Sequence, residues 1–147
     1  MRLTVHTDYA LRMLIYLAVK EDSLATIAEV ADRYGVSQNH LTKVAHHLGV
    51  AGFITTARGK GGGLKLARSA DQISLGAVVR QTEPDMTLVP CFTPGDTSCL
   101  IGPACGLPPI LHEARQAFLA VLDRYTIADL VRRRAGLRAL LHLPETA

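Results

Sequence analysis

The chain has 147 residues, of which 48% are hydrophobic and 20% are charged, and its formal net charge is +3. This length and apolar content suit one globular domain with an extension, and they exclude an intrinsically disordered or low-complexity chain. The longest apolar run near the N-terminus, residues 11–19, is far too short to span a membrane and no export signal is evident, so we expect a cytoplasmic protein without a membrane partner.

Charge is distributed unevenly along the chain. Residues 33–69 contain no Asp or Glu, whereas they contain six Lys or Arg residues and three of the six histidines. A segment that keeps cations and excludes carboxylates is typical of a surface that binds a polyanion. Residues 81–114, by contrast, contain no Lys or Arg.

A first helix is predicted near the N-terminus. Apolar residues recur at i, i+3, i+4, i+7 and i+8 across residues 11–19, which is one face of an amphipathic helix. Thr7 or Asp8 is expected to cap this helix, and Asp8 suits the positive end of the helix dipole.

Two shorter helices follow and predict a helix-turn-helix. Thr26 and Glu29 have the spacing of a capping box, and Gly35 can supply the left-handed residue that ends the second helix. Ser37 is expected to cap the third helix, and Gly49 and Gly52 are expected to close it. The predicted core face of the third helix contains Leu41, Val44, Ala45 and Leu48. A tight, glycine-containing turn between two short helices is typical of a helix-turn-helix.

A β-hairpin is predicted after the third helix. Residues 53–56 and 64–66 have strand character, and the sequence RGKGGG between them predicts a basic, glycine-rich turn. The helix-turn-helix and this hairpin together predict a winged helix-turn-helix. Ser74 is then expected to cap a further helix that runs to about Gln81.

The third helix and the hairpin tip have the residue types of a DNA-binding surface. Gln and Asn can bond adenine edges, Lys can reach guanine or phosphate, and recognition helices read bases with their N-terminal residues. The outward face of the helix is predicted to carry Gln38, Asn39, His40, Thr42, Lys43, His46 and His47. The expected DNA-contacting residues are Ser37, Gln38, Asn39, His40, Lys43, Arg58, Gly59, Lys60 and Gly61. An ordinary solvated helix is the simpler interpretation of this face alone, but the basic hairpin beside it favours DNA, and the turn lacks the residue order of a nucleotide phosphate loop.

All three cysteines lie in one segment that is rich in proline and glycine and is therefore predicted to be a loop. Seven residues separate Cys91 from Cys99, and five separate Cys99 from Cys105. Such thiols suit zinc or an iron–sulfur cluster, but the sequence lacks the close cysteine pairs of zinc sites and the nearby cation that activates a redox thiol. Three incidental buried cysteines are the simpler alternative. The fourth ligand must come from elsewhere, and spacing does not choose among Asp96, Asp85, Glu83, His112, His6 and Asp8.

The C-terminal part of the sequence predicts a long helix and a short one. Pro108 and Pro109 stand where a helix would begin, and an apolar stripe follows them. The stripe contains Leu111, Ala114, Phe118, Val121, Leu122 and Tyr125. So small a domain offers this helix little to pack against, so we expect it to pair with a second copy of the chain and form a homodimer. Thr126 is expected to cap a last helix that runs through Arg134.

Six stretches, distributed in the right order along nearly the whole chain, resemble the winged-helix iron–sulfur regulators. They are LTVHTDYALRMLIYLA, YGVSQNHLTKV, RGKGGGLKLA, VVRQTEPDMTLVPC, GPAC and LDRYTIADLV. The HTDYALR start and the RGKGGG turn mark the broad family. The NHLTK run and the Glu-Pro approach to the first cysteine look closer to the nitric-oxide-sensing repressors within that family.

The resemblance implies a homodimer whose winged-helix domains bind a palindromic operator in double-stranded DNA. It implies an iron–sulfur cluster held by Cys91, Cys99 and Cys105, with Asp8 contributed by the partner subunit as the fourth ligand. We favour a 4Fe–4S cluster, with 2Fe–2S as the alternative. The effector implied is nitric oxide, which would attack the cluster and release the operator.

The expected fold is mainly α with a small β-hairpin wing, arranged as a winged helix-turn-helix plus a long C-terminal dimerisation helix. The expected division is a DNA-binding domain at residues 1–82, a cluster-binding loop at residues 83–107, and the dimerisation helix and C-terminal tail at residues 108–147. No enzymatic activity is expected, because no nucleophile–base arrangement or close carboxylate pair stands out. Two alternatives stay open: a regulator of the same fold that senses iron or cluster supply, and a thiol or iron–sulfur redox protein without specific DNA binding.

Overall fold

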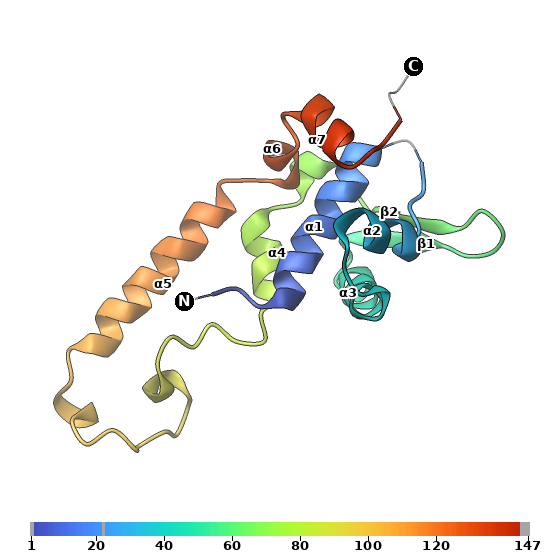
Figure 1. Cartoon of the computed structure of the whole chain (residues 1–147). Coiled ribbons are helices and arrows are strands. Elements are labelled where there is room, and N and C mark those ends of the chain that lie inside the picture. The colour runs from blue at the N-terminus through green and yellow to red at the C-terminus, as the bar shows by residue number, and fades with distance from the viewer. Residues whose placement is uncertain (1, 22, 145–147) are drawn as a thin grey trace.

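The structure is a computed structural model that describes residues 2–21 and 23–144 (Figure 1). In chain order its helices and strands are α1 (Val5–Lys20), α2 (Ile27–Tyr34), α3 (Gln38–Val50), β1 (Ile54–Ala57), β2 (Gly63–Leu66), α4 (Leu75–Thr82), α5 (Leu107–Asp123), α6 (Ile127–Leu130) and α7 (Arg134–Leu140). This mainly helical architecture with one antiparallel hairpin confirms the predicted fold class. None of the helices in the described part of the chain combines the length and the apolar content needed to cross a lipid bilayer.

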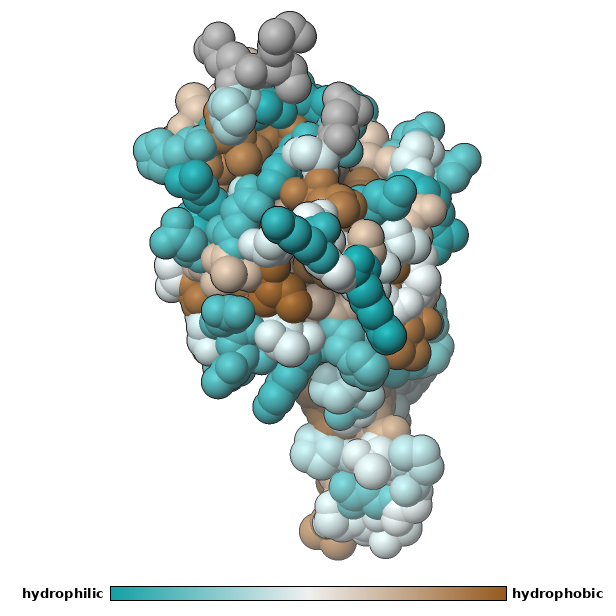
Figure 2. All heavy atoms as spheres, turned by 90° about the vertical axis from the view of Figure 1, so that its right-hand side faces the viewer, coloured by the Kyte–Doolittle hydropathy of each residue, from teal (hydrophilic) through white to brown (hydrophobic). Residues whose placement is uncertain are grey.

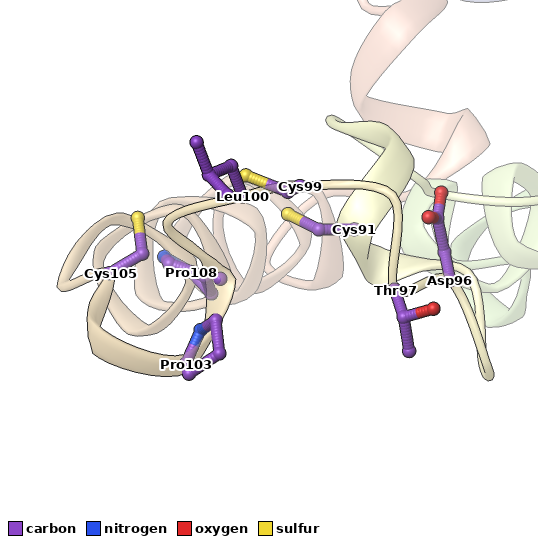
Figure 3. Close-up of a pocket in the computed structure, with 9 residues that line it drawn as sticks. Cys91, Asp96, Thr97, Cys99, Leu100, Pro103, Cys105 and Pro108 are labelled. Carbon is purple, nitrogen blue, oxygen red and sulfur yellow. The ribbon is translucent and has the colours of Figure 1, made fainter.

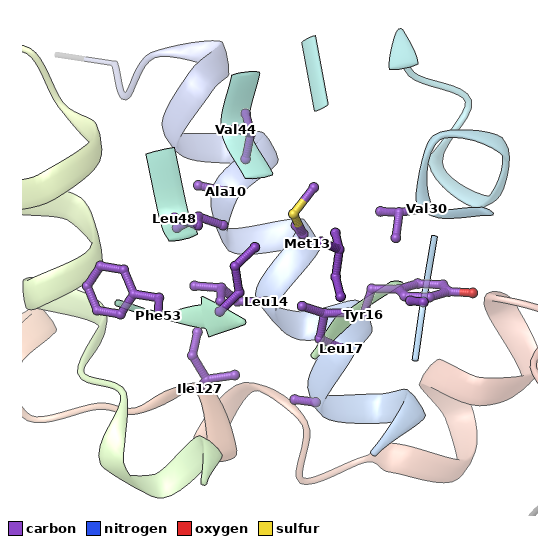
Figure 4. Close-up of a cluster of buried hydrophobic side chains, with 14 of the residues drawn as sticks. Ala10, Met13, Leu14, Tyr16, Leu17, Val30, Val44, Leu48, Phe53 and Ile127 are labelled. Atoms are coloured by element: carbon purple, nitrogen blue, oxygen red, sulfur yellow. The ribbon is translucent and has the colours of Figure 1, made fainter. Parts of the chain in front are cut away.

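Helix α1 is the central element of the folded body. It contacts α3, α4, α6, α7 and the wing strand β2 (Figure 1). Its side chains Ala10, Met13, Leu14, Tyr16 and Val19 have no exposed surface, and they lie among apolar side chains of the surrounding elements (Figure 4). Fully burying one such large apolar side chain stabilises the fold by about 1.5–3 kcal/mol. The position of α1 is therefore fixed mainly by apolar packing.

The N-terminus of α1 differs from the sequence prediction. Thr4 is the N-cap instead of Thr7 or Asp8, because its hydroxyl oxygen accepts a hydrogen bond from the Thr7 amide at 3.2 Å. Glu83 supports this cap: its Oε1 accepts hydrogen bonds from the Thr4 amide at 2.8 Å and from the Thr4 hydroxyl at 3.1 Å. Thr7 is buried, and Asp8 lies in the first turn, where a negative charge favours the helix dipole.

Helices α2 and α3 form the predicted helix-turn-helix. The capping box of Thr26 and Glu29 is present, and Gly35 has the left-handed φ of 61° that ends α2. The predicted core face of α3 is buried. Ser37 precedes α3 as expected, although its side chain makes no capping hydrogen bond. Gly52 closes α3 as predicted, with a left-handed φ of 77° just after the helix. Gly49 does not, because glycine tolerates helical angles at a cost of only about 1 kcal/mol and the helix continues through it.

Strands β1 and β2 form the wing. Each strand includes a residue outside its predicted range, since Ala57 pairs with Gly63 at the tip, and Phe53 is buried just before β1. Ala25 attaches the wing to the body, because its amide and carbonyl form hydrogen bonds with Leu64 at 3.0 and 2.7 Å. Hydrophilic side chains project from this side of the molecule between separate apolar patches (Figure 2).

Helices α4 and α5 connect the winged helix to the cysteine segment. Ser74 caps α4 as predicted. Helix α5 packs against α4 and projects from the body toward the cysteine segment (Figure 1). Arg80 on α4 and Asp123 on α5 form a bidentate ion pair with two N···O distances of 2.6 Å. Gly76 makes room for this pair, because a Cβ atom at its position would lie 1.9 Å from Asp123 Oδ1.

Most of α5 is exposed in the single chain. Leu119 is its one buried residue, whereas Ile110 and Val121 expose 63% and 45% of their surface. Tyr125, the last residue of the predicted stripe, lies beyond the end of the helix. The apolar surface along α5 is therefore largely uncovered within one protomer.

The predicted last helix is divided into two. Thr126 precedes α6 as expected, and Oδ2 of Asp129 accepts hydrogen bonds from its amide at 2.8 Å and from its hydroxyl at 3.0 Å. Helix α6 is short, however, and α7 follows it as a separate helix. This division brings two arginines of α7 to the C-terminal end of α1. Arg134 donates to the Ala18 carbonyl at 3.1 Å, and Arg138 donates to the Val19 carbonyl at 2.9 Å. Carbonyl groups in the last turn of a helix lack a partner within that helix, so α7 stabilises this end of α1.

Candidate functional site

The N-terminal half of α3 presents most of the predicted base-reading side chains to solvent. Gln38, Asn39, His40 and Lys43 are all exposed. The Thr42 hydroxyl beside them donates to a backbone carbonyl of its own helix at 2.9 Å. Polar donors and acceptors that converge on the start of an exposed helix can reach base edges in a major groove.

His47 does not lie on the outward face, contrary to the sequence prediction. It is half-buried, and its Nδ1 is 2.9 Å from Nε2 of His6 on α1, within hydrogen-bonding distance. Burial and the neighbouring His47 lower the pKa of His6 below its ordinary value. The periodicity of α3 alone does not distinguish a histidine at the edge of the core from one that faces solvent.

The wing tip is exposed and basic. Arg58, Gly59, Lys60 and Gly61 all lie on the surface, with positive φ angles of 96° at Gly59 and 81° at Gly61. Glycine adopts such angles readily, which allows a tight turn without strain. The two cations are thereby held beyond the ends of the strands.

A groove of about 630 Å³ separates α3 from the wing. Thr42 and His46, which were predicted on the outward face of α3, line this groove, and so do Thr55 and Thr56 of the wing, which sequence reasoning did not identify as site residues. The alternation of buried and exposed residues expected for a strand could not have identified Thr55 and Thr56 together, because only the first residue of β1 is buried and the next three are exposed. These side chains place hydroxyl and imidazole groups between the two elements that carry the predicted DNA contacts.

The three cysteines line one pocket of about 470 Å³ (Figure 3). Cys91 lies in a single 3-10 turn, and Cys105 directly follows another, so the predicted loop contains two short helical turns. All three are free thiols, with Cys91 and Cys99 exposed and Cys105 partly buried. The other lining residues include no Lys or Arg. Thiols that line one pocket without a competing cation have the donor chemistry that iron–sulfur clusters need.

The cysteines have the donor atoms that a cluster needs, but in one protomer they are not arranged closely enough to bind one. Within residues 2–21 and 23–144, no group of three or more His, Cys, Asp or Glu residues is close enough to hold a metal ion. The Phe92 ring lies 5.5 Å from the Arg115 guanidinium on α5, which ties the first turn of the loop to that helix. The cysteine segment is therefore positioned by α5, while its thiols surround the pocket.

Asp96 is the single predicted fourth-ligand candidate that lines the cysteine pocket. Its Oδ1 accepts a hydrogen bond from the Ser98 amide at 2.8 Å, and the Ser98 side chain and amide hold the pKa of Asp96 below its ordinary value. A carboxylate that completes a local turn in this way has a structural role already.

The remaining fourth-ligand candidates make contacts elsewhere. Asp85 accepts a hydrogen bond from the amide two residues ahead at 2.8 Å, and His112 lies beside two side chains of its own helix. His6 and Glu83 make the contacts described above. Asp8 forms an ion pair with Arg12 at 2.9 Å and is not among the residues that line the cysteine pocket. One protomer therefore does not bring Asp8 and the three thiols together.

Comparison with known proteins identifies the family. The family described as "Rrf2: Iron-dependent Transcriptional regulator" matches residues 3–133. The chain is similar to two proteins named "HTH-type transcriptional regulator NsrR". The protein of Shouchella clausii is 48% identical over 147 residues, which is 99% of each chain. The protein of Bacillus subtilis is 45% identical over 146 residues, which is 99% of this chain and 100% of the relative.

Solved structures show the same fold at lower identity. The structure of T. potens IscR has a TM-score of 0.72 at 21% identity, with 90% of this chain and 88% of that chain covered. The structure of CymR, the global cysteine regulator of B. subtilis, has a TM-score of 0.71 at 24% identity, with 88% and 95% covered. The family match and the relatives named as transcriptional regulators confirm the resemblance indicated by the sequence motifs, and they show a DNA-binding regulator and not an enzyme. The chain belongs to the Rrf2 family of transcriptional regulators.

Proposed function

We propose that this chain is a nitric-oxide-sensitive transcriptional repressor that binds operator DNA as a homodimer while an iron–sulfur cluster is intact. The observation that carries the proposal is that all three cysteines of the chain line a single pocket. Incidental cysteines would have no reason to surround a common space at the surface. The chain's similarity to regulators named NsrR supports the same conclusion.

Cys91, Cys99 and Cys105 would hold the cluster, and Asp8 of the partner subunit would be the fourth ligand. A 4Fe–4S cluster is favoured, with 2Fe–2S as the alternative. When bound, the cluster supplies iron atoms that nitric oxide can ligate. The chain's own contribution is three thiolates from one loop, kept free of any Lys or Arg in the pocket lining. An oxygen ligand from a second chain would make cluster integrity depend on the dimer.

Helix α5 is the proposed dimer contact. Its exposed apolar side chains, including Ile110 and Val121, remain uncovered within one protomer, and exposed apolar stripes of this kind favour association. In this proposal residues 1–82 bind DNA, residues 83–107 bind the cluster, and residues 108–147 provide the dimerisation helix and tail. Sedimentation equilibrium at micromolar concentration should show a dimer.

DNA would be bound by the start of α3 and by the wing tip. The base-reading residues are Ser37, Gln38, Asn39, His40 and Lys43, and the wing residues are Arg58, Gly59, Lys60 and Gly61. Their exposure and the basic character of the wing support this assignment. Because α1 packs directly on α3, a shift of α1 would move the reading residues.

The experiment that tests the proposed function begins with protein purified without oxygen. Iron and sulfide analysis and visible absorbance establish whether a cluster is present, and fluorescence anisotropy measures operator affinity during nitric oxide titration. Loss of operator binding at stoichiometric nitric oxide, with no loss on mild iron depletion, supports the proposal. A response to iron depletion alone favours the iron-sensing alternative, and the absence of any operator-specific binding at moderate salt favours the redox alternative.

Two carboxylate variants provide a matched comparison for the fourth ligand. Asp8→Asn is expected to change the cluster spectrum and weaken the operator response. Asp96→Asn, which alters a carboxylate in the lining of the cysteine pocket, is expected to leave both unchanged. The reverse result would contradict the assignment of Asp8.

A further inference from the structure

We propose that Thr4, His6, His47 and Glu83 form a joint that transmits the state of the cysteine loop to helix α3 within one protomer. We call these four residues the α1 joint. The inference rests on the proposed function, because such a joint matters only if the cysteine loop controls DNA binding. It assigns a coupling role to residues that do not line the cysteine pocket.

The first link joins the cysteine loop to α1. Glu83 is the residue at which α4 ends and the loop begins. Its Oε1 accepts hydrogen bonds from the Thr4 amide at 2.8 Å and from the Thr4 hydroxyl at 3.1 Å. The hydroxyl oxygen of Thr4 in turn accepts a hydrogen bond from the Thr7 amide, which closes the first turn of α1. Hydrogen bonds to a carboxylate are stronger and more directional than neutral ones, so a displacement of Glu83 acts directly on the helix start.

The second link joins α1 to α3. His6 Nε2 and His47 Nδ1 are 2.9 Å apart, and the ring centroids are 5.2 Å apart. The two helices also meet at the rings of Tyr9 and His40, whose centroids are 6.2 Å apart, and buried apolar side chains of both helices, such as Leu14 and Leu48, belong to one core cluster. Apolar packing is not directional, whereas a hydrogen bond fixes the relative orientation of its two groups. The histidine pair therefore sets the orientation of α3 against α1.

The two links converge on one hollow. All four joint residues line a cavity of about 320 Å³ together with Gln81, Thr82 and Pro84. A second hollow of about 190 Å³ lies where the base of the cysteine loop, including Met86 and Leu88, meets the N-terminal residue Leu3. Unfilled space next to a hydrogen-bonded group leaves fewer packing contacts to oppose its movement. The loop base can thus shift against α1 more easily than the packed core can.

The geometry of α3 turns a small shift into a displacement at the DNA surface. His47 lies in the last turn of α3 and Gln38 at its start, so about 13 Å of helix axis separates them. A tilt of about 5° at His47 would move the reading residues by about 1 Å. Hydrogen bonds to bases form within a range of about 0.5 Å, so this displacement is sufficient to break them.

The test compares operator affinity with and without the cluster for four full-length variants. His47→Phe and Glu83→Ala each remove one link, Glu83→Gln keeps an acceptor oxygen, and Tyr16→Phe is the matched control. Tyr16→Phe removes another α1 hydrogen bond, which the Tyr16 hydroxyl donates to Glu29 at 2.6 Å toward the C-terminal end of α1. The measured quantity is the ratio of the operator dissociation constants of cluster-free and cluster-loaded protein.

The ratio is expected to be smaller by about two- to tenfold for His47→Phe and Glu83→Ala, because each variant loses the hydrogen bonding of one link. Their iron content and visible absorbance should stay at wild-type values. Glu83→Gln and Tyr16→Phe should keep the wild-type ratio. The double variant of His47 and Glu83 should be no worse than the more affected single variant, because both links act in series.

Hydrogen exchange of cluster-free protein gives an independent readout. Glu83→Ala should accelerate amide exchange both at residues 4–8 and at residues 45–51, at the end of α3, whereas Tyr16→Phe should not. Acceleration confined to residues 4–8, or variants that keep the wild-type affinity ratio, overturns the α1 joint alone. A wild-type affinity ratio of one overturns the proposed function and the joint with it. If His47→Phe fails to fold, Glu83→Ala and the exchange measurement still decide.

Discussion

Substitution of Gly62 by alanine is expected to weaken operator binding by distorting the wing. A Cβ atom at Gly62 would lie 2.3 Å from the Ala57 carbonyl oxygen and 2.9 Å from the Gly59 carbonyl oxygen. Both oxygens belong to the backbone and cannot rotate away. Ordinary contacts of a Cβ atom begin near 3.4 Å, so the wing tip must open by about 1.1 Å. The turn would also lose the hydrogen bond from the Gly62 amide to Gly59, now 3.0 Å long.

The cost of this overpacking is about 1–3 kcal/mol, and it falls on the turn that holds the two wing cations. If Arg58 and Lys60 lose their fixed positions, operator affinity should fall about tenfold, which corresponds to about 1.4 kcal/mol. The core lies away from the tip, so the thermal midpoint should change much less than the affinity. Binding to random DNA at low salt should also change little, because it depends on charge more than on placement.

The assay is fluorescence anisotropy with labelled operator at several fixed salt concentrations. Gly136→Ala is the matched control, because a Cβ atom there meets nothing within 4 Å and the residue has no positive φ. Wild-type affinity and an unchanged salt dependence in Gly62→Ala would refute the role of the wing. An equal loss in Gly136→Ala would show that the effect is not specific to the wing.

Three further predictions concern stability. Leu48 has no exposed surface, so Leu48→Ala should lower the free energy of unfolding by about 2–5 kcal/mol in denaturant titrations, and a loss below about 1 kcal/mol would contradict the assigned core. Gly76→Ala should displace Asp123 from its ion pair with Arg80, so it should lower the melting temperature by about as much as Asp123→Asn. If the double variant melts at a still lower temperature than either single variant, loss of the ion pair is not the cause. Burial opposes ionisation of Glu29, but hydrogen bonds, first from Lys20, outweigh it and hold the pKa of Glu29 below its ordinary value of 4.5. Because the folded pKa is the lower one, this stabilisation is complete above about pH 4.5 and is lost as the pH falls through the folded pKa. Glu29→Gln should therefore flatten the acid side of the curve of unfolding free energy against pH, and an unchanged curve would count against the network.

Features whose partners are close in sequence were predicted well. The capping box of Thr26 and Glu29, the left-handed Gly35 and the Ser74 cap each depend on residues within one helical turn. These residue types predict the local conformation, because their side-chain hydrogen bonds or their backbone angles are compatible with few other conformations. The helix-turn-helix and the position of the wing follow from these local signals.

Features that depend on distant partners were missed. Thr7 and Asp8 are as suitable for a cap as Thr4, and what distinguishes Thr4 is a hydrogen bond to Glu83, which lies 79 residues away. The prediction that His47 faces outward was wrong because its partner His6 is 41 residues away and leaves no signal in the local sequence of α3. The separation of α6 from α7 likewise serves contacts with the end of α1 that no local pattern encodes.

In the candidate site, too, the local features were predicted and the feature that depends on a distant partner was not. The cysteine spacing and the proline- and glycine-rich composition predicted a common site, and the three thiols do line one pocket. The fourth ligand was not predicted by spacing, and in one protomer Asp8 pairs with Arg12 instead of facing that pocket. A ligand supplied by a second chain leaves no trace in the spacing of the first, so Asp8 stays a prediction from resemblance.

The most direct test of the account is a nitric oxide titration of anaerobically purified, cluster-loaded protein bound to labelled operator. Visible absorbance and anisotropy are recorded in the same cuvette. Operator release is expected to follow the loss of cluster absorbance, and cluster-free protein is expected to bind the operator weakly. Operator that stays bound after the cluster absorbance has gone, or protein that binds equally well without a cluster, would contradict this expectation.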